Sequence, residues 1–251
     1  MPKLPTDPHE MERIVVGLAA AAFKNARDML TSAQAVLDAQ IWPTAFSMAA
    51  LALEEVGKAV LCMTMLGKSP EARDEFRPQV HKAFTDHKTK AACAHLVLAV
   101  VAEEAPATLE QMLDEVIQSA HETNAVKFRG LYVDYTDTGA LLMPDVDEAR
   151  ARWMVSTVTT ALAESRPAEE AVADPDAYLA FLRQWQGSVD FEALEAYIEA
   201  APEDFMADVR ALVRDDVPPP TIFLGSALAQ QITTVDGLHV AAGEEAPPIE
   251  A

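Results

Sequence analysis

The chain has 251 residues, of which 50% are hydrophobic, and a formal net charge of −21 from 19 Lys and Arg against 40 Asp and Glu. This length accommodates one large domain, or a core domain with a helical extension. The acidic balance argues against a general nucleic-acid-binding surface, which needs clustered Lys and Arg, but it leaves room for a local cationic pocket.

The sequence predicts neither a signal peptide nor a membrane-spanning helix. The N-terminus lacks the hydrophobic core of a signal peptide, and Glu54, Glu55 and Lys58 interrupt the apolar run of residues 45–66. Cys62 and Cys93 stand in apolar surroundings without clustered histidines, as thiols of a reducing compartment do. We therefore expect a cytoplasmic protein with no membrane partner.

Hydrophobic periodicity predicts a series of long helices. Asp7 is expected to cap the first, with Pro8 in its first turn and Glu10 completing a capping box. The third is expected to carry His81, His87 and Lys90 as one continuous helix. The other predicted helices span residues 8–40, 44–66 and 108–129, and the third continues through the apolar run 93–101 and ends before Pro106. A capping box over residues 145–148 is expected to open a fifth helix that runs to about Ser165.

These segments and their short connections predict an all-α fold, an antiparallel helical bundle over residues 8–165. Residues 131–135 favour a short extended segment, because Tyr-Val-Asp-Tyr prefers strand to helix. The amino-acid composition changes after Pro167. This change predicts an appended helical subdomain over 166–215, with short helices near 174–187, 191–200 and 203–214. An acidic and flexible tail is expected over 216–251.

Three polar motifs interrupt the apolar segments, and together they predict one site built from three parts of the bundle. Burying charges is costly, so charged groups persist in such places only when they are paired or used. Lys58 has helical spacing to both Glu54 and Glu55 and can pair with either. The residues of the three motifs are Glu54, Glu55 and Lys58; His87 and Lys90; and Lys127, Arg129, Tyr132 and Asp134.

Each motif also has a structural interpretation. Most exposed pairs like that of Lys58 are solvated, and Lys127 suits the end of a helix for electrostatic reasons. Gly57 lowers helix stability relative to Ala, which fits either close helix packing or a ligand that approaches the backbone. His87 is a better candidate for proton transfer than His81, His95 or His121, because it stands among cations.

The sequence does not predict a metal site. A di-iron bundle needs Glu-x-x-His pairs, whereas Glu55 is followed by Lys58 at that spacing, and zinc-binding spacings are missing. A phosphate-binding glycine loop and a serine nucleophile elbow are also missing. No cofactor is expected.

Read in order, Ala52-Leu53-Glu54-Glu55-Val56-Gly57-Lys58, His87-Lys88-Thr89-Lys90 and Arg129-Gly130-Leu131-Tyr132-Val133-Asp134 resemble the AbiV abortive-infection family of the HEPN superfamily. The resemblance covers about residues 10–165. It implies a cytoplasmic phage-defence toxin that shuts down host translation. Superfamily members are commonly dimeric, metal-independent ribonucleases, so it also implies a homodimer, RNA or the ribosome as target, and a possible phage-encoded activator.

The chain departs from the Arg-polar-x-x-x-His motif of those ribonucleases. Arg77 precedes His81 by only four positions, and Lys82 rather than Arg stands five positions before His87. The leading hypothesis is therefore that His87 transfers the proton, while Lys90, Lys58 and Arg129 stabilise the charge on a phosphate. Supporting residues are Glu54 and Glu55, which orient the lysines, with Lys127, Tyr132 and Asp134 at the substrate.

Two alternatives stay open. In the first, the motifs are buried ion pairs of a non-enzymatic interaction module, and the acidic surface binds a basic ribosomal or phage protein. In the second, the C-terminal segment, roughly residues 167–251, restrains the N-terminal domain until infection. Its change in composition is the only motivation for that hypothesis.

Overall fold

A computed structural model describes most of the chain. The predicted site residue Tyr132, the predicted tail 216–251 and the end of the predicted subdomain lie outside the described residues. The structure describes residues 4–68, 70–102, 108–131, 134–136, 139–141, 146–186, 191–201, 203–205 and 207–208.

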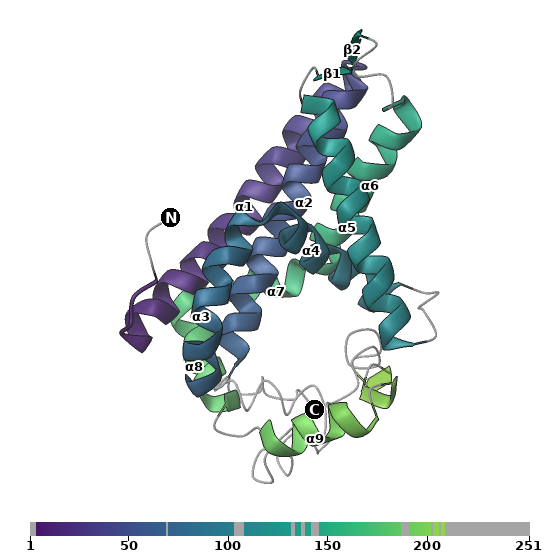
Figure 1. Cartoon of the computed structure of the whole chain (residues 1–251). Helices are drawn as coiled ribbons and strands as arrows, with labels where there is room; N and C mark the ends of the chain where they lie inside the picture. Colours follow the sequence, from purple (N-terminus) through teal and green to yellow (C-terminus); the bar gives the residue numbers. More distant parts are fainter. Residues whose placement is uncertain are drawn as a thin grey trace, which may run out of the picture.

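Two long helices, α1 (Pro8–Asp38) and α2 (Trp42–Gly67), form an antiparallel hairpin (Figure 1). The predicted cap of α1 is confirmed: the Glu10 N–H donates to the Asp7 carboxylate at 2.8 Å. Gln40 takes a left-handed conformation (φ 64°) between the helices, and the Ile41 N–H donates a hydrogen bond to the Val36 carbonyl at 3.1 Å. This arrangement satisfies carbonyls that the end of α1 leaves open.

Helix α2 is the centre of the bundle because it is apolar on nearly every side. It packs against α1, α4 (His87–Val101), α5 (Leu109–Leu131) and α6 (Glu148–Glu164) (Figure 1). Small residues let α1 and α2 approach closely along their length. Buried alanines on these two helices include Ala19, Ala22, Ala26, Ala45, Ala49 and Ala52.

The prediction of one continuous third helix was wrong. The chain forms α3 (Pro70–Thr85) and α4, and Asp86 separates them in an extended conformation. The Asp86 carboxylate accepts the Lys88 N–H at 3.1 Å and the Thr89 hydroxyl at 2.6 Å. Such local bonds compete with a continuous helix and cap a new one. His87 and Lys90 therefore stand in the first turn of α4.

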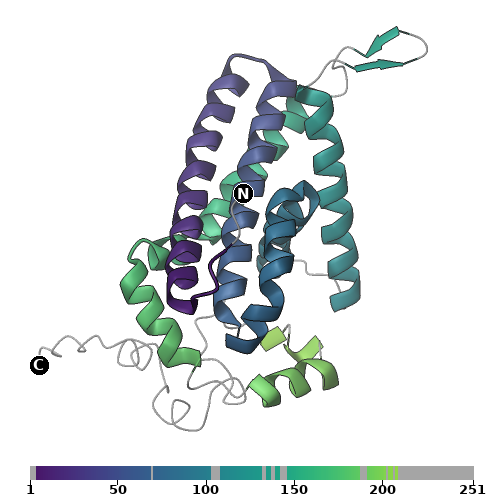
Figure 2. The ribbon, with the colours of Figure 1, turned by 60° about the vertical axis from the view of Figure 1, so that its left-hand side comes forward.

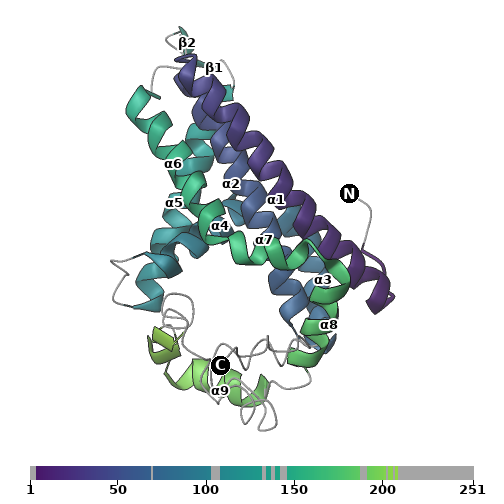
Figure 3. The same ribbon diagram turned by 180° about the vertical axis from the view of Figure 1, so that it is seen from behind.

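Other boundaries differ in detail. Helix α2 begins at Trp42, because Pro43 is compatible with a first helical turn. Asp147 caps α6 by accepting the Arg150 N–H at 2.8 Å; the predicted cap, Asp145, lies outside the described residues. Of the expected extended segment 131–135, Asp134 and Tyr135 lie in the strand β1 (Asp134–Thr136), paired antiparallel with β2 (Gly139–Leu141), whereas Leu131 ends α5. The predicted all-α class is confirmed, and this small hairpin projects from the end of the bundle that carries the α1–α2 turn (Figures 1, 2 and 3).

Three shorter helices follow the bundle: α7 (Arg166–Val172), α8 (Pro175–Gln186) and α9 (Phe191–Ala200). Helices α7 and α8 pack against α1 (Figure 2). Their side chains join the same core as the bundle, namely Val172, Tyr178, Leu179 and Leu182. The domain boundary at 165/166 stays a prediction, but this part of the extension shares its core with the bundle.

Candidate functional site

A buried carboxylate, Glu54, joins the three polar motifs. It lies midway along α2 with only 3% of its surface exposed. Its Oε1 atom accepts a hydrogen bond from the Lys127 ammonium of α5. Its Oε2 atom lies 2.6 Å from Nδ1 of His87 and 3.2 Å from Nζ of Lys90, both on α4. Two lysines and one histidine thus surround a single carboxylate.

The two lysines lie almost entirely inside the protein. Lys127 is 1% exposed and its ammonium also lies 4.5 Å from the centre of the Phe128 ring, while Lys90 is 7% exposed. An isolated buried ammonium or carboxylate is strongly disfavoured, so these charges stabilise the fold only as a group. With two ammonium groups and one carboxylate, the cluster carries a net positive charge even when His87 is neutral.

His87 is the member of the cluster that reaches solvent, with 43% of its side chain exposed. A carboxylate that already binds two ammonium groups can only accept a further hydrogen bond, so Nδ1 of His87 must carry the proton. The neutral ring then presents Nε2 as a proton acceptor. The Phe128 ring meets His87 edge to face, with 5.7 Å between the ring centres, and fixes its orientation further.

Two glycines allow the three helices to meet at this point. A Cβ atom on Gly57 would lie 1.7 Å from the Lys90 carbonyl oxygen, and one on Gly130 would lie 2.6 Å from the Pro43 carbonyl oxygen. The Ser47 hydroxyl lies 2.9 Å from the carbonyls of both Pro43 and Lys127 and links α2 to α5. Close helix packing therefore explains Gly57, which the sequence had left open between packing and a ligand.

The remaining predicted residues are placed apart from this cluster. Lys58 pairs with Glu55, one turn along α2, rather than with Glu54. Arg129 is exposed and its Nε lies 3.4 Å from the Ala125 carbonyl of its own helix. Tyr132 lies outside the described residues, and for Asp134 the structure describes the backbone in β1.

The sequence ranked three other histidines below His87 as candidates for proton transfer, and the structure describes the side chains of two of them. His95 is buried on α4, with Nε2 3.2 Å from the Thr123 hydroxyl of α5, and burial lowers its pKa to about 4. His121 is exposed on α5. The side chain of His81 lies outside the described part of the structure.

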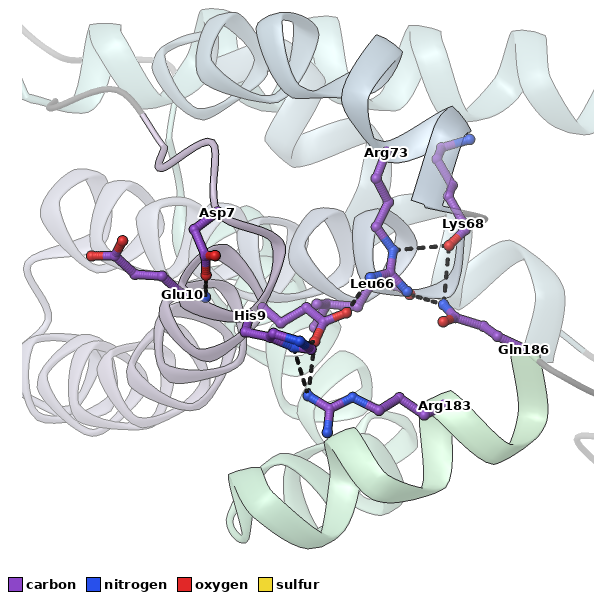
Figure 4. A network of polar contacts seen from close by, with 9 residues as sticks. Asp7, His9, Glu10, Leu66, Lys68, Arg73, Arg183 and Gln186 are labelled. Atoms are coloured by element: carbon purple, nitrogen blue, oxygen red, sulfur yellow. Dashed lines mark hydrogen bonds and ion pairs between the residues drawn. The ribbon is translucent and has the colours of Figure 1, made fainter.

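A second buried network was missed by sequence reasoning (Figure 4). Nη1 of Arg73 lies 2.5 Å from Glu12, and its other nitrogens donate to the Leu66 and Lys68 carbonyls at 2.8 and 2.9 Å. Arg183 of α8 also donates to Glu12, at 3.1 Å. Burial alone raises the pKa of Glu12, but the hydrogen bonds from Arg183 and Arg73 outweigh it and hold the pKa below its ordinary value.

This network joins α1, the end of α2, α3 and α8 beside a cavity of about 370 Å³. Gln186 of α8 donates to the same two carbonyls, at 2.7 and 3.0 Å, so α8 helps to cap α2. One sequence signal existed: Glu12 has helical spacing to the buried residues Val15, Val16 and Ala19. Its partner Arg73 could not be inferred from spacing.

Within the described residues, no three potential ligands among His, Cys, Asp and Glu stand together in a way that could hold a metal ion. Both oxygens of Glu54 are occupied by nitrogen donors, which is the chemistry of an ion cluster rather than of a metal ligand. No helix in the described part of the chain is long and apolar enough to cross a membrane.

With this geometry established, comparison with known proteins assigns the family. A family model for AbiV, of the HEPN type, matches residues 15–162. The chain belongs to the AbiV family. The match contains the whole Glu54 cluster and all of the helices that build it, whereas Glu12 and Arg183 of the second network lie outside it. No curated protein and no solved structure matched the chain.

Proposed function

We propose that this AbiV-family protein is an anti-phage abortive-infection toxin that shuts down host translation as a metal-independent endoribonuclease. The observation that carries the proposal is the pairing of His87 with Glu54: one ring nitrogen is fixed at 2.6 Å on a buried carboxylate, and the ring is 43% exposed. A carboxylate–histidine pair whose ring is partly exposed to solvent is the arrangement of a general base.

The proposed reaction is transesterification of RNA. His87 accepts the proton of a ribose 2′-hydroxyl through Nε2, and the 2′-oxygen attacks the adjacent phosphorus. The bond from phosphorus to the 5′-oxygen breaks, the leaving oxygen takes a proton from solvent, and a 2′,3′-cyclic phosphate remains. The imidazolium formed on His87 is stabilised by Glu54, which lies beside the donated proton.

Positive charge for the phosphate is supplied by the surroundings of His87. Lys90 holds its ammonium 3.2 Å from the Glu54 oxygen that also binds His87, and the first turn of α4 adds the positive end of a helix dipole. Lys58 and Arg129 remain candidates for direct phosphate contact, since both have exposed or partly exposed side chains. Lys127, at 1% exposure, acts in this proposal by positioning Glu54.

The test is cleavage of total RNA and of ribosomes by the purified protein in the presence of a chelator. We expect discrete fragments ending in cyclic phosphate from the wild type, and no fragments from His87→Ala. His9→Ala is the matched control, because His9 is exposed on α1 and takes no part in the cluster. Unchanged cleavage by folded His87→Ala would remove His87 from the mechanism.

A second candidate function rests on the burial of Lys127, Lys90 and Glu54. Such clusters also serve only to fix helix positions, and then the acidic protein would act by binding a basic ribosomal or phage protein. For that function, His87→Ala retains toxicity in cells, and a variant that disrupts the cluster loses toxicity through its stability. Loss of toxicity in stable His87→Ala protein excludes this candidate.

A further inference from the structure

The polar motif at the start of α4 has two faces, and the Glu54 cluster uses only one of them. His87 and Lys90 contact Glu54. The other polar residues of the motif line a hollow of about 200 Å³ between the start of α4 and the middle of α5. Residues one or two positions apart in a helix do not face the same way, which separates the two sets. The residues that line the hollow from this motif are Asp86, Lys88 and Thr89.

The rest of the lining is mainly apolar. It consists of Ala92 of α4 and of Ile117, Ala120 and His121 of α5. Apolar contact surface with a few polar groups that fix orientation is typical of sites for small ligands. A cavity of about 150 Å³ holds benzene, so a hollow of this size accepts one planar nucleobase.

The hollow lies beside His87. Asp86 and Lys88, which line it, are the sequence neighbours of His87. On α5, His121 shares a helix face with Phe128, seven residues later, and Phe128 contacts the His87 ring. A base in the hollow therefore places its own ribose near His87, the residue that accepts the 2′-hydroxyl proton in the proposed reaction.

Asp86 supplies the group that can distinguish one base from another. Its Oδ1 atom accepts the Lys88 N–H at 3.1 Å, and its Oδ2 atom accepts the Thr89 hydroxyl at 2.6 Å. Each oxygen of an ionised carboxylate can accept two hydrogen bonds, so each retains an acceptor site for a ligand. The hydrogen bond from Thr89 holds the pKa of Asp86 below its ordinary value, and the group is therefore a pure acceptor at neutral pH.

Guanine suits such an acceptor better than the other bases. It carries two adjacent N–H donors, on N1 and N2, which can bind the two oxygens of one carboxylate together. Adenine and cytosine each place an acceptor nitrogen beside their amino group, and uracil places a carbonyl on either side of its single N–H. Lone pairs that face a carboxylate are repulsive, so the hollow discriminates against these three bases.

We propose that the hollow is a guanine-binding subsite, in which Asp86 accepts hydrogen bonds from N1 and N2 of the base. The guanosine bound there is the nucleotide whose 2′-hydroxyl reacts, so cleavage falls on the 3′ side of guanosine. Only the position of cleavage rests on the proposed function. The affinity of the hollow for guanine does not depend on it.

Titration calorimetry with mononucleotides tests the subsite apart from any cleavage. We expect the full-length wild type to bind guanosine 3′-monophosphate about tenfold to a hundredfold more tightly than adenosine 3′-monophosphate. Asp86→Asn should remove this preference, because an amide presents one acceptor oxygen instead of two, while Asn still caps a helix. Asp147→Asn is the matched control, since Asp147 caps α6 in the same way and does not line the hollow.

A second variant fills the hollow without changing a charged group. Ala92→Leu adds a larger side chain to its lining, and we expect the affinity for guanosine 3′-monophosphate to fall about tenfold or more. Thermal unfolding verifies that both variants are folded.

Three results would overturn the proposal. They are no binding or equal binding of the two mononucleotides by the wild type, a guanosine preference that folded Asp86→Asn retains, and unchanged binding by folded Ala92→Leu. A guanosine preference in a protein that cleaves no RNA would leave the subsite standing and refute the ribonuclease. Cleavage after all four bases alike would leave the ribonuclease standing and refute the subsite.

Discussion

Glu54 determines the site at the scale of single residues. Its carboxylate is 3% exposed, and the cost of burying it is offset by three nitrogen partners from two other helices. The partners differ in access to solvent, because Lys127 and Lys90 are enclosed while His87 is not. Lys127 consequently serves the fold, and His87 can serve chemistry as well.

Replacing Lys127 with methionine should separate these roles. The variant keeps the apolar stem but leaves Oε1 of Glu54 without its ammonium partner, so we expect a loss of roughly 3 kcal/mol in the free energy of unfolding. Urea unfolding measures the loss. Lys24→Met is the control, because Lys24 forms an exposed pair with Asp28 and its replacement should have no measurable effect. Equal stability of the two variants would show that the cluster adds nothing to the fold.

At the scale of elements, the site exists because α2, α4 and α5 approach closely. Gly57 lets the α4 backbone lie on α2 at Lys90, and Gly130 lets α5 lie on α2 near Pro43. The break at Asp86 is equally important, since it starts α4 in a new direction and puts His87 and Lys90 in its first turn.

Gly57→Ala tests the contact between α2 and α4. The added Cβ would lie 1.7 Å from a backbone oxygen, so the helices must separate, and we expect a loss of about 2–3 kcal/mol measured as a lower thermal midpoint. Gly17→Ala is a matched control inside α1, where nothing lies within 4 Å of the new atom. That variant should gain up to about 1 kcal/mol from helix propensity. A neutral or stabilising Gly57→Ala would contradict this packing.

At the scale of the whole molecule, the extension and the bundle are joined by buried polar groups as well as by a shared core. Glu12 binds Arg73 of α3 and Arg183 of α8, and Gln186 caps the end of α2. These contacts join segments from both ends of the described chain. The hypothesis that the C-terminal segment restrains the bundle stays a prediction, and α7 and α8, which belong to that segment, both pack against α1.

The stability of the whole protein should depend on pH through His95. Burial lowers its pKa to about 4 from an ordinary value of 6.5, so the folded state holds it neutral while the unfolded state takes up a proton below about pH 6.5. Stability is thus full above pH 6.5 and falls as the pH drops toward 4, by roughly 3 kcal/mol for this group. Urea midpoints measured across this range should fall less steeply for His95→Gln than for the wild type. Identical slopes would refute the assignment.

The sequence by itself determined the long helices α1, α2, α5 and α6, the all-α class and the membership of Glu54, His87, Lys90 and Lys127 in polar motifs, although it missed the break at Asp86. Periodicity and caps such as Asp7 are local properties, so they can be read from neighbouring residues. The same local information indicated the family, because the three motifs occur in a fixed order and spacing along the chain.

Only the tertiary structure decided which charges meet. Local spacing allowed Lys58 to pair with Glu54 or with Glu55, and the fold pairs it with Glu55 because Lys127 and the α4 residues occupy Glu54. Glu12 has helical spacing to apolar residues of α1, but no local signal pointed to Arg73 as its partner. Partners on different helices are set by the rotation and register of helices in contact, and these depend on packing at residues such as Gly57 that no sequence period encodes.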